Sequence, residues 1–331
     1  MKRVKISVAM CTYNGAEFLL AQLESIVAGT RTPDEIVICD DGSTDGTRAL
    51  LESFSRQTTI PITLRFNEKN LGVVKNFEQA IRLCTGDVIA LSDQDDVWRH
   101  DKLQLIEEKF NKHPAAGVVF SDAEIVDHEL RSLKRRIWNE VNFDARKRKL
   151  LAQGRALEVL ITGWTVTGAT MAMRSQFVNF SLPIPEGIAM IHDGWIALTI
   201  ATVAEVVPIN DTLIKYRQHA RQQIGVPERA KAGPAPRGVQ AIETAFRRRN
   251  SSAELHKVLE ELEQRLQLHT GQYDTRKALS FVGDYAFHLN VRANLPQRRL
   301  NRVPRILREL LSLRYHEYAN GFKSAAKDLV S

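Results

Sequence analysis

The sequence has very few cysteines. Only three of its 331 residues are cysteine, and Cys11, Cys39 and Cys84 all lie in apolar segments without the paired spacing of a zinc site. A disulfide framework is therefore excluded as the basis of the fold. We expect reduced thiols, as is usual for proteins of the cytoplasm.

Long apolar runs are also missing. The longest apolar window, residues 188–209, is interrupted by His192, Asp193 and Glu205, so we expect no membrane-spanning helix. The basic N-terminus turns polar before an apolar segment of signal-peptide length is complete. These absences predict a cytoplasmic protein.

Two common phosphate-binding loops are absent as well. The chain contains neither a Gly-x-Gly-x-x-Gly loop nor a Walker-type loop, which disfavours dinucleotide-dependent enzymes and P-loop kinases. Hydrophobic residues make up 44% and charged residues 26% of the chain, a composition typical of a folded protein rather than a disordered one.

Positive charge is concentrated near the C-terminus. Residues 1–225 carry 27 Lys and Arg against 28 Asp and Glu, whereas residues 226–331 carry 19 against 11. A basic C-terminal region fits an anionic membrane surface or nucleic acid. For nucleic acid we expect only weak, salt-sensitive binding without sequence specificity.

The last helical pattern combines this charge with apolar residues. We expect a helix that begins at Pro304, with Ile306, Leu307, Leu310 and Leu311 on one side and arginines on the other. Such a basic amphipathic helix suits peripheral contact with the inner face of the cell membrane. Packing against the N-terminal part of the chain, with the arginines outward, explains the pattern equally well.

The N-terminal third alternates strands and helices. The first two strands are joined by a helical crossover, so we expect them to be parallel. The order predicts an α/β nucleotide-binding half-domain with a mostly parallel central sheet flanked by helices. We expect strands at 5–10, 35–39, 61–66 and 88–91. We expect helices at 16–28 and 73–84, and a further helix after the second strand that ends at about residue 56.

The remainder divides into a second half of the same domain and a helical extension. We expect a domain over 1–225, split into halves at 1–98 and 99–225, a Pro-containing linker at 226–236, and a basic helical region at 237–331. The strongly basic stretch 127–158 is expected to be irregular. Further expected elements are a helix at 102–111, strands at 117–120, 168–173 and 214–219, and helices at 191–203, 239–268 and 276–291.

Carboxylates follow two of the predicted strands. Asp93, Asp95 and Asp96 end the buried run 88–91, and Asp40 and Asp41 end the strand at 35–39. Ligands bind beyond the carboxyl ends of strands in open α/β sheets, so we expect a divalent metal at the first group and a nucleotide at the second. Solvated turns that cap the following helices are the alternative.

Taken together, seven ordered motifs resemble the inverting glycosyltransferases of family 2, which have the GT-A fold. The resemblance covers about residues 4–225 and is similar in detail to the rhamnosyltransferase-like branch that builds bacterial surface polysaccharides. The motifs lie at 11–15 (Cys-Thr-Tyr-Asn-Gly), 39–45, 70–77, 92–98 (Ser-Asp-Gln-Asp-Asp-Val-Trp), 168–171, 192–193 (His-Asp) and 216–219 (Tyr-Arg-Gln-His).

The resemblance implies transfer of a sugar, such as rhamnose, from a dTDP- or UDP-sugar to a hydroxyl of a glycan or lipid-linked glycan, with inversion. It implies Asp193 as the general base and Mn²⁺ or Mg²⁺ held by Asp95 with Asp93 or Asp96. The nucleotide-sugar itself would be bound by Thr12, Tyr13, Asp40, Asp41, Lys75, Asp93, Arg217 and His219.

Two other function classes stay open at this point. A nucleotidyltransferase also uses paired carboxylates and a metal, but is expected to carry a Gly-rich basic loop after the first strand, which residues 11–15 do not supply. A non-catalytic nucleotide-sugar or glycan binding module would explain the basic region but would leave Asp93, Asp95 and Asp193 without a role.

Overall fold

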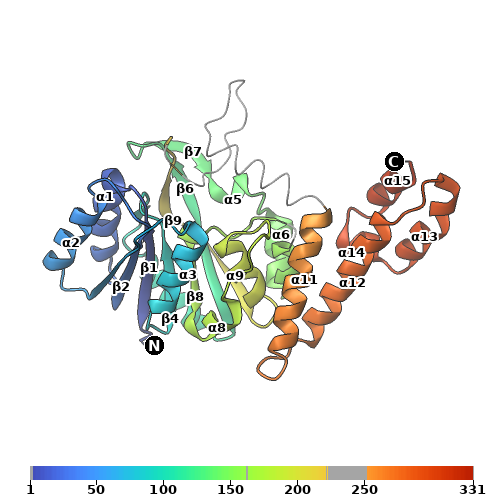
Figure 1. Cartoon of the computed structure of the whole chain (residues 1–331), viewed down its shortest axis with the longest axis horizontal. Coiled ribbons are helices and arrows are strands. Elements are labelled where there is room, and N and C mark those ends of the chain that lie inside the picture. Colours follow the sequence, from blue (N-terminus) through green and yellow to red (C-terminus); the bar gives the residue numbers. More distant parts are fainter. Residues whose placement is uncertain (1–2, 162, 221, 223–251, 331) are drawn as a thin grey trace. The chain divides into compact units, whose positions relative to one another are not determined.

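The computed structural model describes residues 3–161, 163–220, 222 and 252–330 (Figure 1). The described residues form two compact units, the first containing the sheet and the second containing the C-terminal helices. The predicted linker at 226–236 and the first part of the helix predicted at 239–268 lie outside the described residues. No helix in the described part of the chain is long and apolar enough to span a membrane.

The first half of the sheet-containing unit has the predicted alternation of strands and helices. Its strands lie in the order β3-β2-β1-β4, and every neighbouring pair is parallel. The carboxyl ends of these strands therefore share one edge of the sheet. The elements are β1 (Ile6–Thr12), α1 (Ala16–Val27), β2 (Glu35–Asp40), α2 (Thr47–Gln57), β3 (Ile62–Phe66), α3 (Val73–Leu83) and β4 (Val88–Ser92).

Burial explains why these segments are strands. Val88, Ile89, Ala90 and Leu91 of β4 are fully buried, as expected for a central parallel strand that is covered on both faces. Strand β1 lies between β2 and β4 and is buried along almost its whole length. Asp93 and the residues after Thr12 leave these strands at the same edge of the sheet.

The second half of the sheet is mixed, whereas β1 to β4 are parallel throughout, as expected. Strand β8 is antiparallel to both β4 and β6, and β9 is parallel to β6 but antiparallel to β5. The sheet continues from β4 in the order β8-β6-β9-β5, with β7 on β6. The strands are β5 (Val97–Trp98), β6 (Ala116–Val126), β7 (Ser132–Arg136), β8 (Met171–Arg174) and β9 (Glu205–Arg217).

Three predictions for this half are corrected. The strand expected at 117–120 is the centre of a much longer strand, and the strand expected at 168–173 begins with the 3₁₀ turn Gly168–Thr170. The basic stretch 127–158 is ordered into β7 and short helices, because Ile137, Trp138 and Leu151 anchor it in the core. The helices are α4 (Lys102–Lys112), α5 (Ile137–Glu140), α6 (Ala145–Ala152), α7 (Ala156–Leu160), α8 (Val178–Ser181) and α9 (His192–Ile200).

The second unit is helical, as predicted. A small core of Ile306, Tyr315 and Ala325 joins its last helices, and Asp328 accepts hydrogen bonds from Arg292 and Tyr315. The described helices are α11 (Ser252–Leu268), α12 (Arg276–Ala293), α13 (Arg299–Leu311), α14 (Arg314–Tyr318) and α15 (Phe322–Val330).

Helix α13 differs from the predicted helix in two respects. It begins at Arg299, so Pro304 lies inside it rather than at its start. Ile306 is buried, but Leu307 and Leu311 are 51% and 84% exposed, so the predicted apolar face is divided between the core and the surface. The exposed leucines follow Leu300 at helical spacing and form a separate stripe.

Candidate active site

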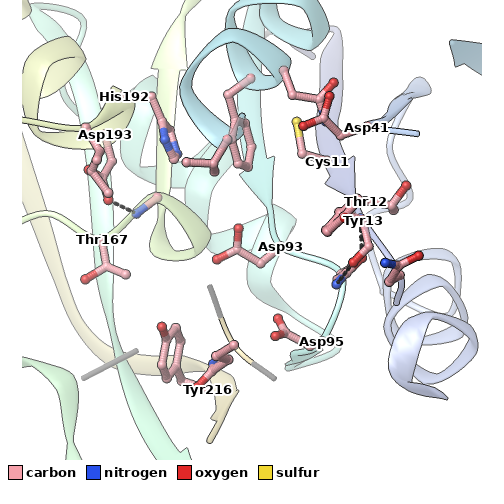
Figure 2. A pocket seen from close by; sticks show the side chains of 18 residues that line it. Cys11, Thr12, Tyr13, Asp41, Asp93, Asp95, Thr167, His192, Asp193 and Tyr216 are labelled. Carbon is pink, nitrogen blue, oxygen red and sulfur yellow. Dashed lines mark hydrogen bonds between the residues drawn. The ribbon is translucent and has the colours of Figure 1, made fainter. Parts of the chain in front are cut away.

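A pocket of about 300 Å³ lies at the carboxyl edge of the parallel strands (Figure 2). Its walls come from segments far apart in the sequence, as expected for a site at the switch point of an α/β sheet. The lining residues are Cys11–Asn14 after β1, Asp41 after β2, Val73, Asn76 and Phe77 of α3, Asp93–Asp95 after β4, Thr167–Gly168, Ile191–Asp193, Tyr216 of β9, and Gln222.

The structure brings six of the predicted site residues together in this pocket. In Figure 2, Asp193 lies at one end, Asp93 near the middle, and Asp41 at the opposite end. The other predicted residues, Asp40, Lys75, Asp96, Arg217 and His219, do not line it. The six that do are Thr12, Tyr13, Asp41, Asp93, Asp95 and Asp193.

Asp40 and Asp41 have different surroundings. The Asp40 carboxylate is buried and accepts hydrogen bonds from the hydroxyls of Thr12 and Ser43, at 2.7 and 2.5 Å. Asp41 lines the pocket, and its carboxylate accepts the backbone N–H groups of Leu71 and Gly72, at 2.8 and 2.9 Å. Asp40 thus ties the end of β1 to the following loop, while Asp41 is the one of the pair that a ligand can meet.

The three carboxylates after β4 also separate. Asp93 and Asp95 line the pocket, whereas Asp96 is fully buried and accepts the backbone N–H of Arg217 at 3.0 Å. Within the described ranges, no group of three or more His, Cys, Asp or Glu side chains is arranged to hold a metal ion. Asp93, Asp95 and Asp96 therefore do not converge as a three-carboxylate site.

Burial shifts the protonation of this acidic segment. Burial, together with the charges of Asp95 and Asp193, raises the pKa of Asp93 to about 7. Burial also raises the pKa of Asp96, and the neighbouring carboxylates add to the shift. A cation bound beside Asp93 would favour its ionised form, so the donor set suits a hard divalent metal that shares its remaining positions with phosphate oxygens.

Arg217 and His219 hold this acidic segment from behind. The Arg217 guanidinium donates from Nε to the backbone carbonyl of Asp95 at 2.7 Å, and from Nη1 to the carbonyl of His128. His219 Nε2 lies 2.8 Å from Asp95 Oδ2. Because Arg217 is only 4% exposed and outside the pocket lining, the prediction that it contacts phosphate is not supported by its placement.

Lys75 is also placed away from the pocket lining. Its ammonium pairs with Glu78 at 3.0 Å and with Glu186 at 3.4 Å. The hydrogen bond that Lys75 donates to Glu78 raises the pKa of Lys75, and desolvation opposes this only in part. Its charge is thus directed to carboxylates of the protein.

Lys102 is a buried residue that the sequence did not single out. It is 1% exposed, donates from Nζ to the carbonyl of Ala169 at 2.7 Å, and lies 3.6 Å from the ring centroid of Trp98. Burial lowers the pKa of Lys102 to about 7, against the charges of Asp96 and Asp93. A lysine at the first position of a helix is unfavourable for the helix dipole, and this is the signal that could have identified it.

Asp193 lies in the first turn of helix α9 and is held in one orientation. Its Oδ2 accepts the N–H of Gly168 at 2.8 Å, and its Oδ1 accepts the N–H of Gly194 at 2.6 Å. The side chain is 5% exposed yet lines the pocket. The carboxylate is therefore fixed toward the cavity, as a general base must be.

The pocket also contains lining residues that were not predicted to bind a ligand. Gln94 pairs with the backbone of Tyr13 through both its carbonyl and its amide, at 2.8 and 3.1 Å. A Cβ at Gly15 would lie 2.1 Å from Gln94 Oε1, so a side chain there would displace the Gln94 amide from Tyr13. This contact joins the loops after β1 and β4, and nothing in the spacing of the two motifs indicates it.

Comparison with known proteins agrees with this architecture. Residues 7–176 match the family model described as glycosyl transferase family 2. An uncharacterized glycosyltransferase of Nostoc sp. is 30% identical over 220 residues, which are 65% of each chain. The chondroitin synthase of Escherichia coli is 33% identical over 132 residues, which are 39% of this chain but 19% of that protein.

A solved structure matches nearly the whole chain. The structure of S. aureus TarS residues 1–349 in complex with UDP-GlcNAc has a TM-score of 0.54 and 14% identity, covering 98% of this chain and 90% of that one. At this identity the likeness concerns the fold. The chain spans less than two thirds of the length of the curated relatives named above.

Proposed function

The chain belongs to glycosyl transferase family 2, and from this premise we propose that it transfers a sugar from a nucleoside diphosphate donor to a hydroxyl of a glycan or lipid-linked glycan. The observation that carries the proposal is the order of carboxylates along one pocket: Asp41, then Asp93 and Asp95, then Asp193 (Figure 2). A nucleotide, its diphosphate and the reacting sugar would need them in this order.

The nucleotide is assigned to the Asp41 end. Asp41 is rigid because the 70–72 turn is hydrogen-bonded to it, and Thr12 and Tyr13 flank it in the lining. Asp40 contributes indirectly, by fixing the Thr12 hydroxyl. The fold neighbour TarS was solved with UDP-GlcNAc, which supports a uridine or related pyrimidine nucleotide here.

The leaving diphosphate is assigned to Asp93 and Asp95. These carboxylates would hold Mn²⁺ or Mg²⁺. Such an ion is commonly bound by one or two carboxylates of the protein together with phosphate oxygens of the substrate. Such a metal, when bound, supplies positive charge where the leaving diphosphate develops negative charge. His219 orients the Asp95 carboxylate from the side away from the pocket, and Arg217 and Lys102 fix the surrounding backbone.

Asp193 is assigned as the general base. Its carboxylate accepts two backbone N–H groups, those of Gly168 and Gly194. These two bonds hold the carboxylate pointing into the cavity. Removal of the acceptor proton on the face of the sugar opposite the diphosphate gives inversion at the anomeric carbon.

We further propose rhamnose, as its dTDP-sugar, as the donor to be tested first, with surface polysaccharide as the product class. Support comes from the motif resemblance and from a relative in Erwinia amylovora named as an amylovoran biosynthesis glycosyltransferase, 29% identical over 131 residues, which are 38% of this chain and 44% of that protein.

The direct test is a screen of nucleoside diphosphate sugars for hydrolysis and for thermal stabilisation of the protein, with Mn²⁺ present. We expect one pyrimidine nucleotide-sugar to stabilise the protein and to be hydrolysed to sugar and nucleoside diphosphate. Release of pyrophosphate would instead indicate a nucleotidyltransferase. Stabilisation without turnover, in the presence of saccharide acceptors, would indicate a binding module.

Peripheral membrane contact is proposed for the second unit. Leu300, Leu307 and Leu311 are 85%, 51% and 84% exposed along one stripe of α13. Residues 298–314 contain six arginines and one acidic residue, Glu309, whose carboxylate is buried against His288 and Arg314. Exposed leucines among arginines suit the interface of an anionic bilayer.

Liposome flotation tests this contact. The full chain should float with vesicles containing phosphatidylglycerol at low salt and be released at high salt, since each basic residue near the surface contributes about 1 kcal/mol. Replacement of the three leucines by serine should abolish flotation. Replacement of Leu83 by serine, an exposed leucine of the first unit, is the control; equal flotation of the triple variant would contradict the proposal.

A further inference from the structure

His192 is buried in the wall of the pocket without an evident partner. It is 4% exposed, and neither ring nitrogen has a hydrogen-bond partner in the part of the chain that the structure describes. Buried polar groups are almost always hydrogen-bonded, and leaving one unpaired is unfavourable. A histidine retained in this position therefore needs an explanation that a packing role alone does not give.

The position of the ring is fixed by packing. It stacks on Phe77 with a centroid separation of 4.0 Å and an interplanar angle of 15°. Burial lowers the pKa of His192 despite the neighbouring charge of Asp193, so at neutral pH the imidazole is uncharged. It then presents one donor and one acceptor nitrogen.

Gly168 packs against one of these nitrogens. A Cβ added at Gly168 would lie 2.9 Å from His192 Nε2 and 3.6 Å from Asp193 Oδ2. The imidazole nitrogen and the carboxylate thus both lie beside Gly168, where a side chain would collide with the ring. Figure 2 shows both at the end of the pocket opposite Asp41, the end assigned to the reacting sugar hydroxyl.

We propose that His192 is a substrate-binding residue whose ring hydrogen-bonds an acceptor hydroxyl adjacent to the hydroxyl that Asp193 deprotonates. The inference rests on the proposed function and specifies its substrate class: the acceptor carries two neighbouring hydroxyls. An acceptor that lacks the second hydroxyl leaves the buried imidazole unpaired, and sites built on such hydrogen bonds discriminate strongly against the missing group.

The kinetic test compares His192→Phe with the wild type. Phenylalanine keeps a flat ring on Phe77 but has no hydrogen-bonding atom. His192→Asn restores a side chain that can hydrogen-bond. The probes are methyl glycosides of glucose, galactose, mannose and rhamnose, with the best acceptor compared with its deoxy analogue. His256→Phe, an exposed histidine of α11, is the matched control.

We expect His192→Phe to lower kcat/KM for the methyl glycoside at least about tenfold, mainly through KM, while donor hydrolysis by water changes less than about twofold. The wild type should discriminate against the deoxy acceptor and His192→Phe should not, with His192→Asn intermediate. Unchanged acceptor kinetics in His192→Phe, or an equal loss of hydrolysis and transfer, would overturn the inference.

A binding measurement separates this inference from the proposed function. In wild-type protein with ¹⁵N-labelled histidine, the His192 ring signals should shift when the methyl glycosides are added, whether or not any nucleotide-sugar is turned over. If the donor screen fails but the ring signals shift, the proposed transferase function is contradicted, while the proposed contact between His192 and a saccharide is supported. If no methyl glycoside shifts the ring signals, the His192 imidazole hydrogen-bonds only water, and the proposed contact is overturned.

Discussion

Asp93→Asn should stabilise the metal-free protein at alkaline pH. Because burial raises the pKa of Asp93 to about 7, above the ordinary value of 3.8, the folded state binds this proton more tightly than the unfolded state does. The resulting stability is fully present below about pH 4 and is lost as the pH rises through about 7. Asparagine has no proton to lose, so the variant avoids this loss.

The magnitude follows from the two pKa values. At about 1.36 kcal/mol per pKa unit, the difference between the pKa values of Asp93 in the folded and unfolded states corresponds to roughly 4 kcal/mol in the free energy of unfolding. Asp93 is only partly buried, so solvent screens part of this, and we expect a gain of about 1–3 kcal/mol for Asp93→Asn at pH 8. Near pH 4 the variant and the wild type should unfold with similar free energies.

Urea unfolding in EDTA, followed by tryptophan fluorescence, measures this difference. All four tryptophans, Trp98, Trp138, Trp164 and Trp195, belong to the first unit, so the signal reports on the domain that contains Asp93. Asp211→Asn, at a side chain that is 57% exposed, is the control. Parallel stability–pH curves for Asp93→Asn and the wild type would refute the reasoning.

Three further predictions concern the same site. Lys102→Met should lower the free energy of unfolding by about 1–3 kcal/mol, because the Ala169 carbonyl loses its donor and the Trp98 ring its cation; unchanged urea midpoints would contradict this. Gly168→Ala should lower transfer at least about tenfold without changing nucleotide affinity by calorimetry, since its Cβ meets His192 Nε2; normal turnover would show that this space is not used. Removal of divalent cations by EDTA should weaken donor binding, and Mn²⁺ should restore it; calorimetry showing equal affinity in both conditions would exclude the metal at Asp93 and Asp95.

The N-terminal half of the fold was predictable because its signals are local. Apolar runs such as Val88–Leu91 alternate with segments whose apolar residues recur at helical spacing. This pattern predicts β1 to β4 and the helices between them, with ends correct to within a few residues. Strands β6 and β9 were predicted too short because polar residues such as Asp122 and Asp211 interrupt their apolar pattern. Asp122 is accommodated by pairing with Thr212 of β9, which the sequence pattern does not show.

The candidate site was predictable where its carboxylates lie in sequence motifs. Asp41, Asp93, Asp95 and Asp193 were named from motifs, and the structure places all four in one pocket. The roles of the positively charged residues were less predictable, because the sequence does not show whether a basic side chain points into the pocket or contacts other groups of the protein. Arg217 and Lys102 stabilise backbone carbonyls behind the acidic segment, and Lys75 is paired with glutamates.

The most direct test of the account is the rate of sugar transfer by Asp193→Asn, with Asp211→Asn as control. Asparagine can still accept the Gly168 N–H that Asp193 accepts, so the fold and donor binding should be retained. The account predicts unchanged nucleotide-sugar affinity and a rate of transfer lower by about 10²–10⁴. Transfer by Asp193→Asn at close to the wild-type rate would contradict the assignment of Asp193 as the base.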